Sequence, residues 1–178
     1  MQSRLCTKKE RNKMKKSIVW KRISSLLLAF VFVFGTASTT FAATEEYHIG
    51  DVVDGSVLIN DTEAEATIMN PMRGNILDQG TTRLTDKGGG VVNVYGAVFG
   101  SVVCDKLILD MTLQRLQNGT WVDVKYFSDT AYNTGYLTNS YNTSVTKGYY
   151  YRVKAACVAQ KGSTSESKMP VTNGIWID

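Results

Sequence analysis

Residues Asp105–Ser128 read DKLILDMTLQRLQNGTWVDVKYFS and carry the strongest structural signal in the 178-residue chain. Large apolar residues occupy every second position from Leu107 to Leu113, which is the period of a strand with one buried face. Asn118 and Gly119 follow, and this pair favours a two-residue hairpin turn because both residues tolerate positive φ. The stretch therefore predicts a long antiparallel hairpin.

The turn also predicts the register of this hairpin. Gln117 is expected opposite Thr120, which sets Leu113 opposite Val124 farther along. The returning strand is then expected to point one row of side chains toward the core: Val122, Val124 and Tyr126.

Shorter alternating segments, separated by turn residues, lie on both sides of the hairpin. The expected strands are residues 81–85, 91–99, 105–117, 120–128, 135–145, 149–159 and 174–177. About seven short strands in one domain are typical of an immunoglobulin-like or fibronectin-like fold. We therefore expect an all-β domain over residues 73–178, built as an antiparallel β-sandwich.

The segment before this domain, residues 43–72, is acidic and has few large apolar residues. Its short apolar pieces at 51–53 and 56–59 allow one strand or a small hairpin. The composition fits a mobile arm equally well. We describe it as an acidic N-terminal arm and leave both alternatives open.

The first 42 residues have the pattern of a secretory signal peptide. Lys or Arg occupies nine of the first 22 positions, an apolar run follows over Ile23–Phe34, and small residues lead to Ala42. We expect a helical signal peptide over residues 1–42 that is cleaved after Ala42, with Met14 as an alternative start. A membrane span needs about 20 apolar residues, so an uncleaved anchor is the less favoured alternative. The sequence predicts a secreted product.

Removal of this segment changes the charge of the protein. The whole chain has a formal net charge of +4, but residues 43–178 hold 11 Lys and Arg against 15 Asp and Glu. The basic residues therefore belong mainly to the export signal. We expect no nucleic-acid partner for the remaining domain and no membrane association after cleavage.

Two cysteines remain after Cys6 leaves with the signal. An even number in an exported chain predicts a disulfide between Cys104 and Cys157. By the chain-entropy model, closing that loop contributes about 4 kcal/mol. Strand alternation argues the other way, because Cys157 falls on an inward row while Cys104 falls opposite the Leu107 row unless a bulge intervenes. Two unpaired thiols, one of them buried, are the alternative.

Residues with catalytic potential form no recognisable constellation. His48 is the single histidine and lies in the acidic segment, so a histidine-based triad or a zinc site is not expected. The acidic runs of the arm lack the glycine-centred spacing of a calcium loop. A glycosidase needs two facing carboxylates, and the candidates are read as outward side chains: Asp105, Asp110, Asp123 and Asp129. We expect no catalytic residue, no metal site and no cofactor.

Aromatic residues are the one feature that suggests a binding role. Tyrosines cluster in the C-terminal half of the chain together with Trp121 and Trp176. Exposed aromatic rings on a sheet can stack on sugars or anchor a protein. Alternation places Tyr150 on the outward row, which makes it the candidate binding aromatic. Alternation also places Trp121 outward, where a cross-strand pair with Leu116 accounts for this residue as well as a ligand would.

Four segments together resemble a protein family: residues 73–77, 113–121, 145–153 and 172–176. The NGTW turn at 118–121 and the GYYYRV strand at 148–153 are the most specific pieces. The resemblance is to small exported proteins of Gram-positive, spore-forming bacteria that are grouped as a domain of unknown function. It covers residues 73–178 and implies a secreted protein. It implies no activity and no site residue.

Taken together, the sequence predicts a secreted, non-enzymatic β-sandwich protein that binds a glycan or a protein at the cell envelope. Two alternatives remain open at this point. One is a secreted hydrolase that acts through carboxylates, and the other is a bacteriocin-like effector.

Overall fold

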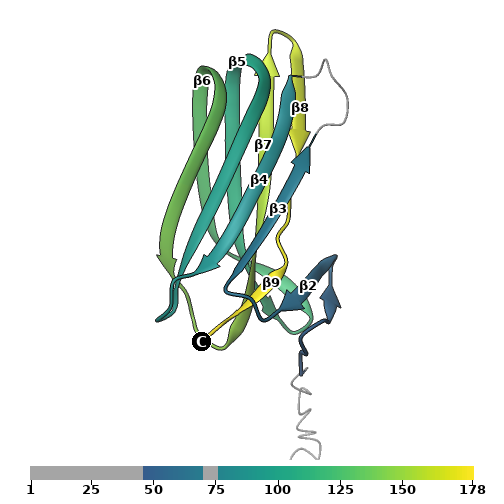
Figure 1. The fold of residues 1–178 in the computed structure, drawn as a ribbon, viewed down its shortest axis with the longest axis vertical. Coiled ribbons are helices and arrows are strands. Elements are labelled where there is room, and N and C mark those ends of the chain that lie inside the picture. The colour runs from purple at the N-terminus through teal and green to yellow at the C-terminus, as the bar shows by residue number, and fades with distance from the viewer. Residues whose placement is uncertain (1–45, 70–75) are drawn as a thin grey trace, which may run out of the picture. The chain divides into compact units, whose positions relative to one another are not determined.

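The computed structural model describes residues 46–69 and 76–178 (Figure 1). Within these ranges the chain forms nine strands and no helix. The strands are β1 Val52–Val53, β2 Ser56–Ile59, β3 Glu63–Met69, β4 Leu77–Asp86, β5 Val91–Gln117, β6 Thr120–Ser144, β7 Tyr149–Lys161, β8 Thr164–Lys168 and β9 Gly174–Ile177. The expected signal peptide over 1–42 lies outside the described residues. In the described part of the chain, no helix is long and apolar enough to span a membrane.

All nine strands belong to one hydrogen-bonded sheet. Their order is β1-β2-β9-β7-β5-β4-β3, with β6 paired to β5 and β8 paired to β7. Every pair is antiparallel except β2 and β9, which run parallel. The all-β prediction is therefore confirmed. The predicted sandwich of two antiparallel sheets is not confirmed. Hydrogen bonds instead join all nine strands into one mixed sheet, which curls.

The curl is produced by a corner in the two longest strands. Residues 100–103 of β5 lie opposite Gly135 alone in β6, so the pairing jumps from Phe99–Tyr136 to Cys104–Thr134. An insertion of this kind bends a paired ribbon sharply. Figure 1 shows β5 and β6 turning over together at one end. Before the corner β5 pairs with β4, and after it β5 pairs with β7.

The corner brings the two halves of the sheet face to face. A Cβ added to Gly96 in the first half would lie 2.6 Å from Met111 Sδ in the second, and one added to Gly80 of β4 would lie 2.9 Å from Cys157 Cβ of β7. The strand β6 folds in the same way, since the Tyr141 hydroxyl donates to Asp129 at 2.8 Å. The main core fills the space between the halves, and its largest fully buried members are Leu77, Leu84, Leu107, Leu109, Met111, Leu113, Tyr151, Ile175 and Ile177.

A second, smaller cluster lies apart from this core. It contains Leu58, Leu116, Trp121 and Tyr150. The β1–β2 hairpin contributes to it, and its turn at Asp54 and Gly55 has positive φ at both residues. The acidic segment is thus a hairpin followed by strand β3, which pairs with β4 over its whole length. Of the two alternatives that the sequence left open, residues 51–69 take the ordered one, and they belong to a compact unit that spans residues 44–178.

The hairpin register is confirmed near the turn and wrong beyond it. Asn118 and Gly119 both have positive φ, and Gln117 pairs with Thr120. An irregularity between Leu113 and Gln114 then sets Leu113 opposite Lys125 in place of Val124. One extra residue in β6 reverses its alternation. Val124 and Tyr126, which were expected to point inward, are consequently exposed by 41% and 68%. Val122 precedes the irregularity and keeps its predicted partner Arg115, yet it is also exposed, by 42%.

The predicted disulfide is not present in the structure, where Cys104 and Cys157 are both buried free thiols. Cys157 pairs with Leu109, five positions along β5 from Cys104. At about 3.3 Å per residue that separation is about 16 Å, whereas a disulfide needs Cα atoms within about 7 Å. Cys104 instead faces Val102 O at 3.4 Å, and Cys157 faces Ala97 O at 3.6 Å. The corner shifts the strand alternation, which is why both thiols point inward.

Candidate functional site

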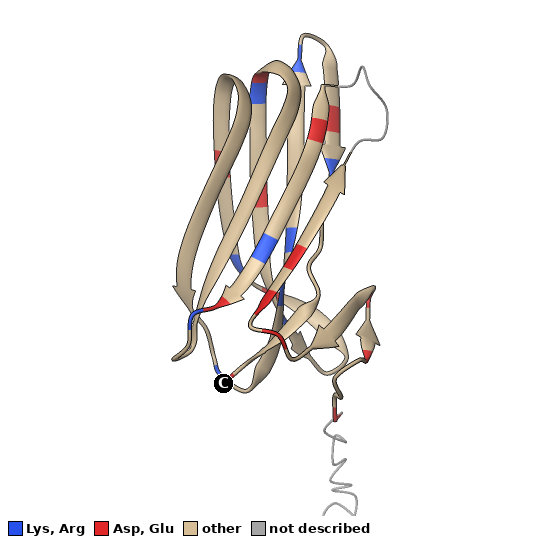
Figure 2. Ribbon diagram, in the orientation of Figure 1, with Lys and Arg blue, Asp and Glu red and all other residues tan. Residues whose placement is uncertain are grey.

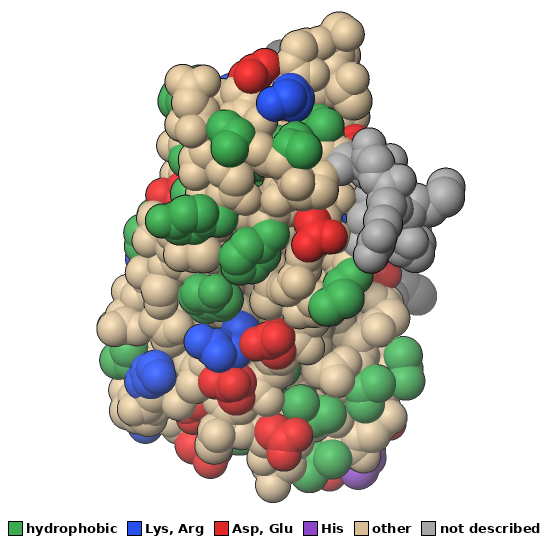
Figure 3. Space-filling model, turned by 45° about the horizontal axis from the view of Figure 1, so that its top comes forward, with side chains coloured by type: hydrophobic (Ala, Val, Ile, Leu, Met, Phe, Trp, Pro, Cys, Tyr) green, Lys and Arg blue, Asp and Glu red, His purple; other side chains and the backbone are tan. Residues whose placement is uncertain are grey.

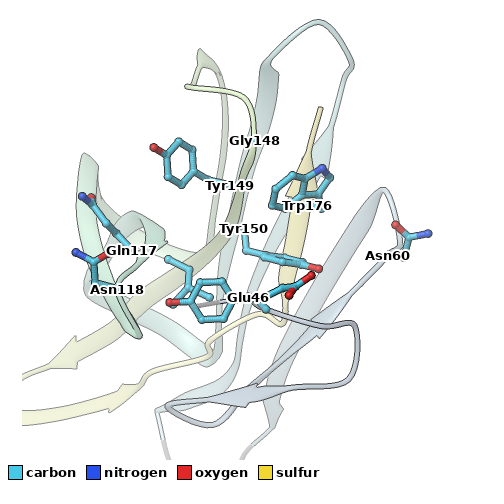
Figure 4. A pocket seen from close by; sticks show the side chains of 10 residues that line it. Glu46, Asn60, Gln117, Asn118, Gly148, Tyr149, Tyr150 and Trp176 are labelled. Atoms are coloured by element: carbon cyan, nitrogen blue, oxygen red, sulfur yellow. The ribbon is translucent and has the colours of Figure 1, made fainter. Parts of the chain in front are cut away.

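An aromatic cleft of about 770 Å³ lies where the β5–β6 turn, the start of β7 and the end of β9 meet the first described segment (Figure 4). Its lining residues come from parts of the chain that are far apart in sequence: Glu46, Tyr47, Asn60, Leu116, Gln117, Asn118, Gly148, Tyr149, Tyr150 and Trp176. Four of them are aromatic and three carry amide side chains.

Strand alternation explains how β7 supplies the Tyr150 ring, while Tyr149 lies at the start of the strand, partly buried against the main core. Tyr151 points into the main core, so Tyr150 points to the other face of the sheet, where the smaller cluster lies. Tyr150 pairs with Trp176 of β9, and the two rings meet edge to face with centroids 5.1 Å apart. Tyr150 is only 7% exposed, while Trp176 is 38% exposed. Tyr150 therefore lies at the base of the cleft and Trp176 at its rim.

This placement changes the role assigned to Tyr150 from the sequence. The residue is on the expected face, but the other members of the smaller cluster cover it. Burial raises the pKa of its hydroxyl, and the negative charge of Asp51 adds to that effect. Tyr150 is therefore a neutral phenol at physiological pH. Trp121, which was also expected outward, is 8% exposed and donates its indole N–H to Val53 O at 3.0 Å.

The polar side of the cleft comes from the β5–β6 turn and the segment before β1. Gln117 and Asn118 extend from the turn, and Asn60 follows β2 (Figure 4). The backbone N–H of Gly119 donates to the hydroxyl of Tyr47, which ties the first described segment to the turn. Glu46 is the one ionisable carboxylate among the described lining residues. The cleft thus offers aromatic faces, amide donors and acceptors, and a single negative charge.

A buried arginine packs against the smaller cluster, which supplies Leu116 and Tyr150 to the cleft. Arg152 of β7 donates to Asp54 Oδ2 at 2.6 Å, to Ser56 Oγ at 2.9 Å and to Gln114 Oε1 at 2.8 Å. Its guanidinium lies over the Trp121 ring at 4.5 Å. The hydrogen bond from Arg152 and its positive charge lower the pKa of Asp54. These contacts hold the β1–β2 hairpin against the sheet.

The carboxylates considered for a glycosidase are all engaged by neighbours outside the cleft. Asp123 accepts from Tyr126 and Gln114, both at 2.6 Å, and the Tyr126 hydrogen bond is the main cause of its lowered pKa. The other three accept from local partners: Asp105 from Gly162 N, Asp110 from Ser128 Oγ, and Asp129 from Tyr141 and Asn139. Within the described ranges, no group of three metal-ligating side chains occurs.

Charged and exposed apolar residues are dispersed over the sheet. Figure 2 shows Lys and Arg placed singly among Asp and Glu, with acidic residues more frequent around β1 to β3. On the face drawn in Figure 3, hydrophobic side chains lie in several small groups with polar side chains between the groups. The most exposed tyrosines lie on β6, namely Tyr126, Tyr132 and Tyr136. None of these three residues lines the aromatic cleft.

Sequence reasoning identified Tyr150 but not the residues around it. Trp176 and Tyr149 were visible as aromatics close to strand ends, yet only the β7–β9 pairing brings Trp176 beside Tyr150. Tyr47 and Glu46 come from a segment that showed no local signal for a site. Comparison with known proteins gives no match, either to a family model or to a curated sequence.

Proposed function

We propose that this protein is a secreted, non-enzymatic binding protein whose aromatic cleft takes a glycan of the cell envelope. The single observation that supports the proposal most is the composition of the cleft, in which four aromatic rings are combined with three amides and one carboxylate. The N-terminal signal pattern and the resemblance to exported Gram-positive proteins support the location.

The chemistry of the lining suits a sugar ring. A pyranose has apolar C–H faces that stack on aromatic rings, and hydroxyl groups that exchange hydrogen bonds with amides. Trp176 provides the most accessible ring, the partly buried Tyr149 lies beside the cleft, and Gln117 and Asn118 provide the amides. The volume of about 770 Å³ is in the range of small-ligand sites.

The hydrolase alternative is less well supported at this cleft. Acid–base cleavage of a glycosidic bond uses two carboxylates about 5–10 Å apart. Glu46 is the only carboxylate among the described residues that line the cleft. Glycan binding without turnover therefore fits the lining better, and we do not propose the bacteriocin-like alternative because no described feature favours it.

A glycan array followed by titration of the best ligand tests the proposal. Trp176→Ala is expected to weaken binding at least tenfold, because stacking on an aromatic ring is lost at the rim. Tyr132→Ala, which removes a ring on β6 that is more exposed than Trp176, is expected to bind as the unsubstituted protein does. Absence of any saturable glycan binding, or equal losses in both variants, would contradict the proposal.

A further inference from the structure

A second pocket, of about 280 Å³, lies between β5, β6 and the segment 143–146. Two cationic side chains, Arg115 and Lys125, reach its lining from the two strands of the long hairpin. Hydroxyl groups of Thr143, Ser144 and Thr146 line another part. No Asp or Glu is among the described lining residues.

Aromatic rings hold the two cations in place. The guanidinium of Arg115 lies 4.5 Å from the centroid of the Tyr149 ring, and Lys125 Nζ lies 5.6 Å from that of Phe127. Lys125 also donates to Thr143 Oγ1 at 2.7 Å. Ion pairs within the described chain involve Arg83, Arg152 and His48. The charges of Arg115 and Lys125 are therefore oriented but not neutralised by a carboxylate.

Arg115 has hydrogen-bonding capacity left over. One terminal nitrogen donates to Gln117 Oε1 at 2.9 Å. Its Nε is buried and has no hydrogen-bond partner in the part of the chain that the structure describes. A buried donor without a partner is costly. Arg115 as a whole is only partly buried and lines the pocket, so its guanidinium can offer other N–H donors to an oxyanion there.

We infer that this pocket binds a phosphate group. Guanidinium and ammonium groups form charge-assisted hydrogen bonds to phosphate oxygens, and Arg can offer two parallel donors. The threonine hydroxyls add donors for further oxygens. Arg115, Lys125 and Thr143 do not line the aromatic cleft, although Arg115 contacts the cleft residues Tyr149 and Gln117. Among the described residues Lys125 has no such contact, so its replacement tests the phosphate inference separately from the glycan proposal.

Calorimetric titration of protein expressed from the full chain tests the inference, with inorganic phosphate and glycerol phosphate as separate ligands at constant ionic strength. Saturable binding at one site is expected for at least one of them. A preference for glycerol phosphate would show that the natural ligand is an ester, and a preference for the inorganic ion would show a free anion.

Three variants locate the site. Arg115→Gln and Lys125→Gln are each expected to weaken phosphate binding about tenfold, the loss of one charge-assisted contact. Lys106→Gln is the matched control, because Lys106 also lies over a tyrosine ring, that of Tyr132 at 6.0 Å, but outside the pocket. It is expected to bind as the unsubstituted protein does.

Thermal unfolding without ligand confirms that each variant is folded, and Lys125 is exposed enough for its replacement to leave the fold intact. The inference is overturned if neither phosphate ligand saturates, or if the two pocket variants bind as tightly as Lys106→Gln. It is also overturned if acetate binds as tightly as phosphate, since that would assign a carboxylate site.

Discussion

Cys104 and Cys157 show how far a single residue's role depends on its position in the curled sheet. Both side chains are fully buried, and each faces a different backbone carbonyl. Burial raises the pKa of Cys157 to about 12 and also raises that of Cys104. Neither thiol therefore ionises at neutral pH, and the thiolate is the reactive form.

The mass of the purified protein is expected to be the same before and after treatment with a reductant. Thiol-specific reagents are expected to modify both cysteines only after denaturant is added, because the folded protein keeps them protonated and inaccessible. A gain of two hydrogens on reduction would show that the two residues are bridged after all.

Asp123 is a residue whose ionisation contributes to stability. Hydrogen bonds from Tyr126 and Gln114 lower its pKa below the ordinary value of 3.8. A carboxyl group with a lowered folded-state pKa stabilises the protein above the unfolded-state value, and this contribution is lost as the pH falls through the folded-state value.

We expect the free energy of unfolding to decrease below about pH 4, and we expect Asp123→Asn to make that decrease shallower. Urea unfolding measured between pH 2 and pH 7 tests this expectation. Asp61→Asn, a change at an exposed loop residue between β2 and β3, serves as the control. An equal effect of both substitutions would contradict the role given to Asp123.

Among the elements, the folded β5–β6 ribbon decides the architecture. Its two halves approach so closely that Gly96 leaves no room for a side chain, with Leu109 Cδ1 at 2.8 Å from an added Cβ as well as Met111 Sδ. At Gly135 in the corner the nearest atom to an added Cβ is Val102 O at 3.7 Å, an ordinary contact. An added methyl group would therefore clash at Gly96 but fit at Gly135.

Gly96→Ala is expected to lower the free energy of unfolding by about 1–3 kcal/mol through overpacking. Gly135→Ala should change it by less than about 1 kcal/mol, because the added methyl group has space and the φ angle is not in the left-handed region. Chemical denaturation of both variants makes the comparison. A neutral Gly96→Ala would show that the two halves are not packed as described.

The sequence predicted those elements whose apolar residues alternate. The segments that became β4, β7 and β9 were predicted as strands, as were both halves of β5 and the first half of β6. The second half of β6 was also predicted, although its residues are mainly polar and rich in Thr, Asn and Tyr. The sequence did not predict β3 and β8. Each pairs with a neighbouring strand but buries few side chains, so its residues are mainly polar or small and give no alternating apolar pattern. The sequence also predicted the ribbon as four separate strands, since the corner at 100–103 looks locally like a turn between strands.

For the whole molecule, long-range pairing limited what could be predicted. The aromatic cleft needs the β7–β9 register to place Trp176 beside Tyr150, and it needs Tyr47 to reach the turn at Gly119. The phosphate pocket needs the irregularity at Leu113 and Gln114, after which Lys125 pairs with Leu113. Neither register follows from local alternation, because each depends on contacts between residues far apart in the chain.

We propose glycan binding at the aromatic cleft and not at the exposed tyrosines of β6. The most direct test is a two-dimensional NMR titration of the isotope-labelled protein with soluble cell-wall fragments. We predict saturable shifts at the Trp176 indole N–H and at the backbone amides of Asn118 and Tyr149, with Tyr132 unchanged. Shifts centred on Tyr132 and Tyr136, or no shifts at saturating glycan, would contradict the account.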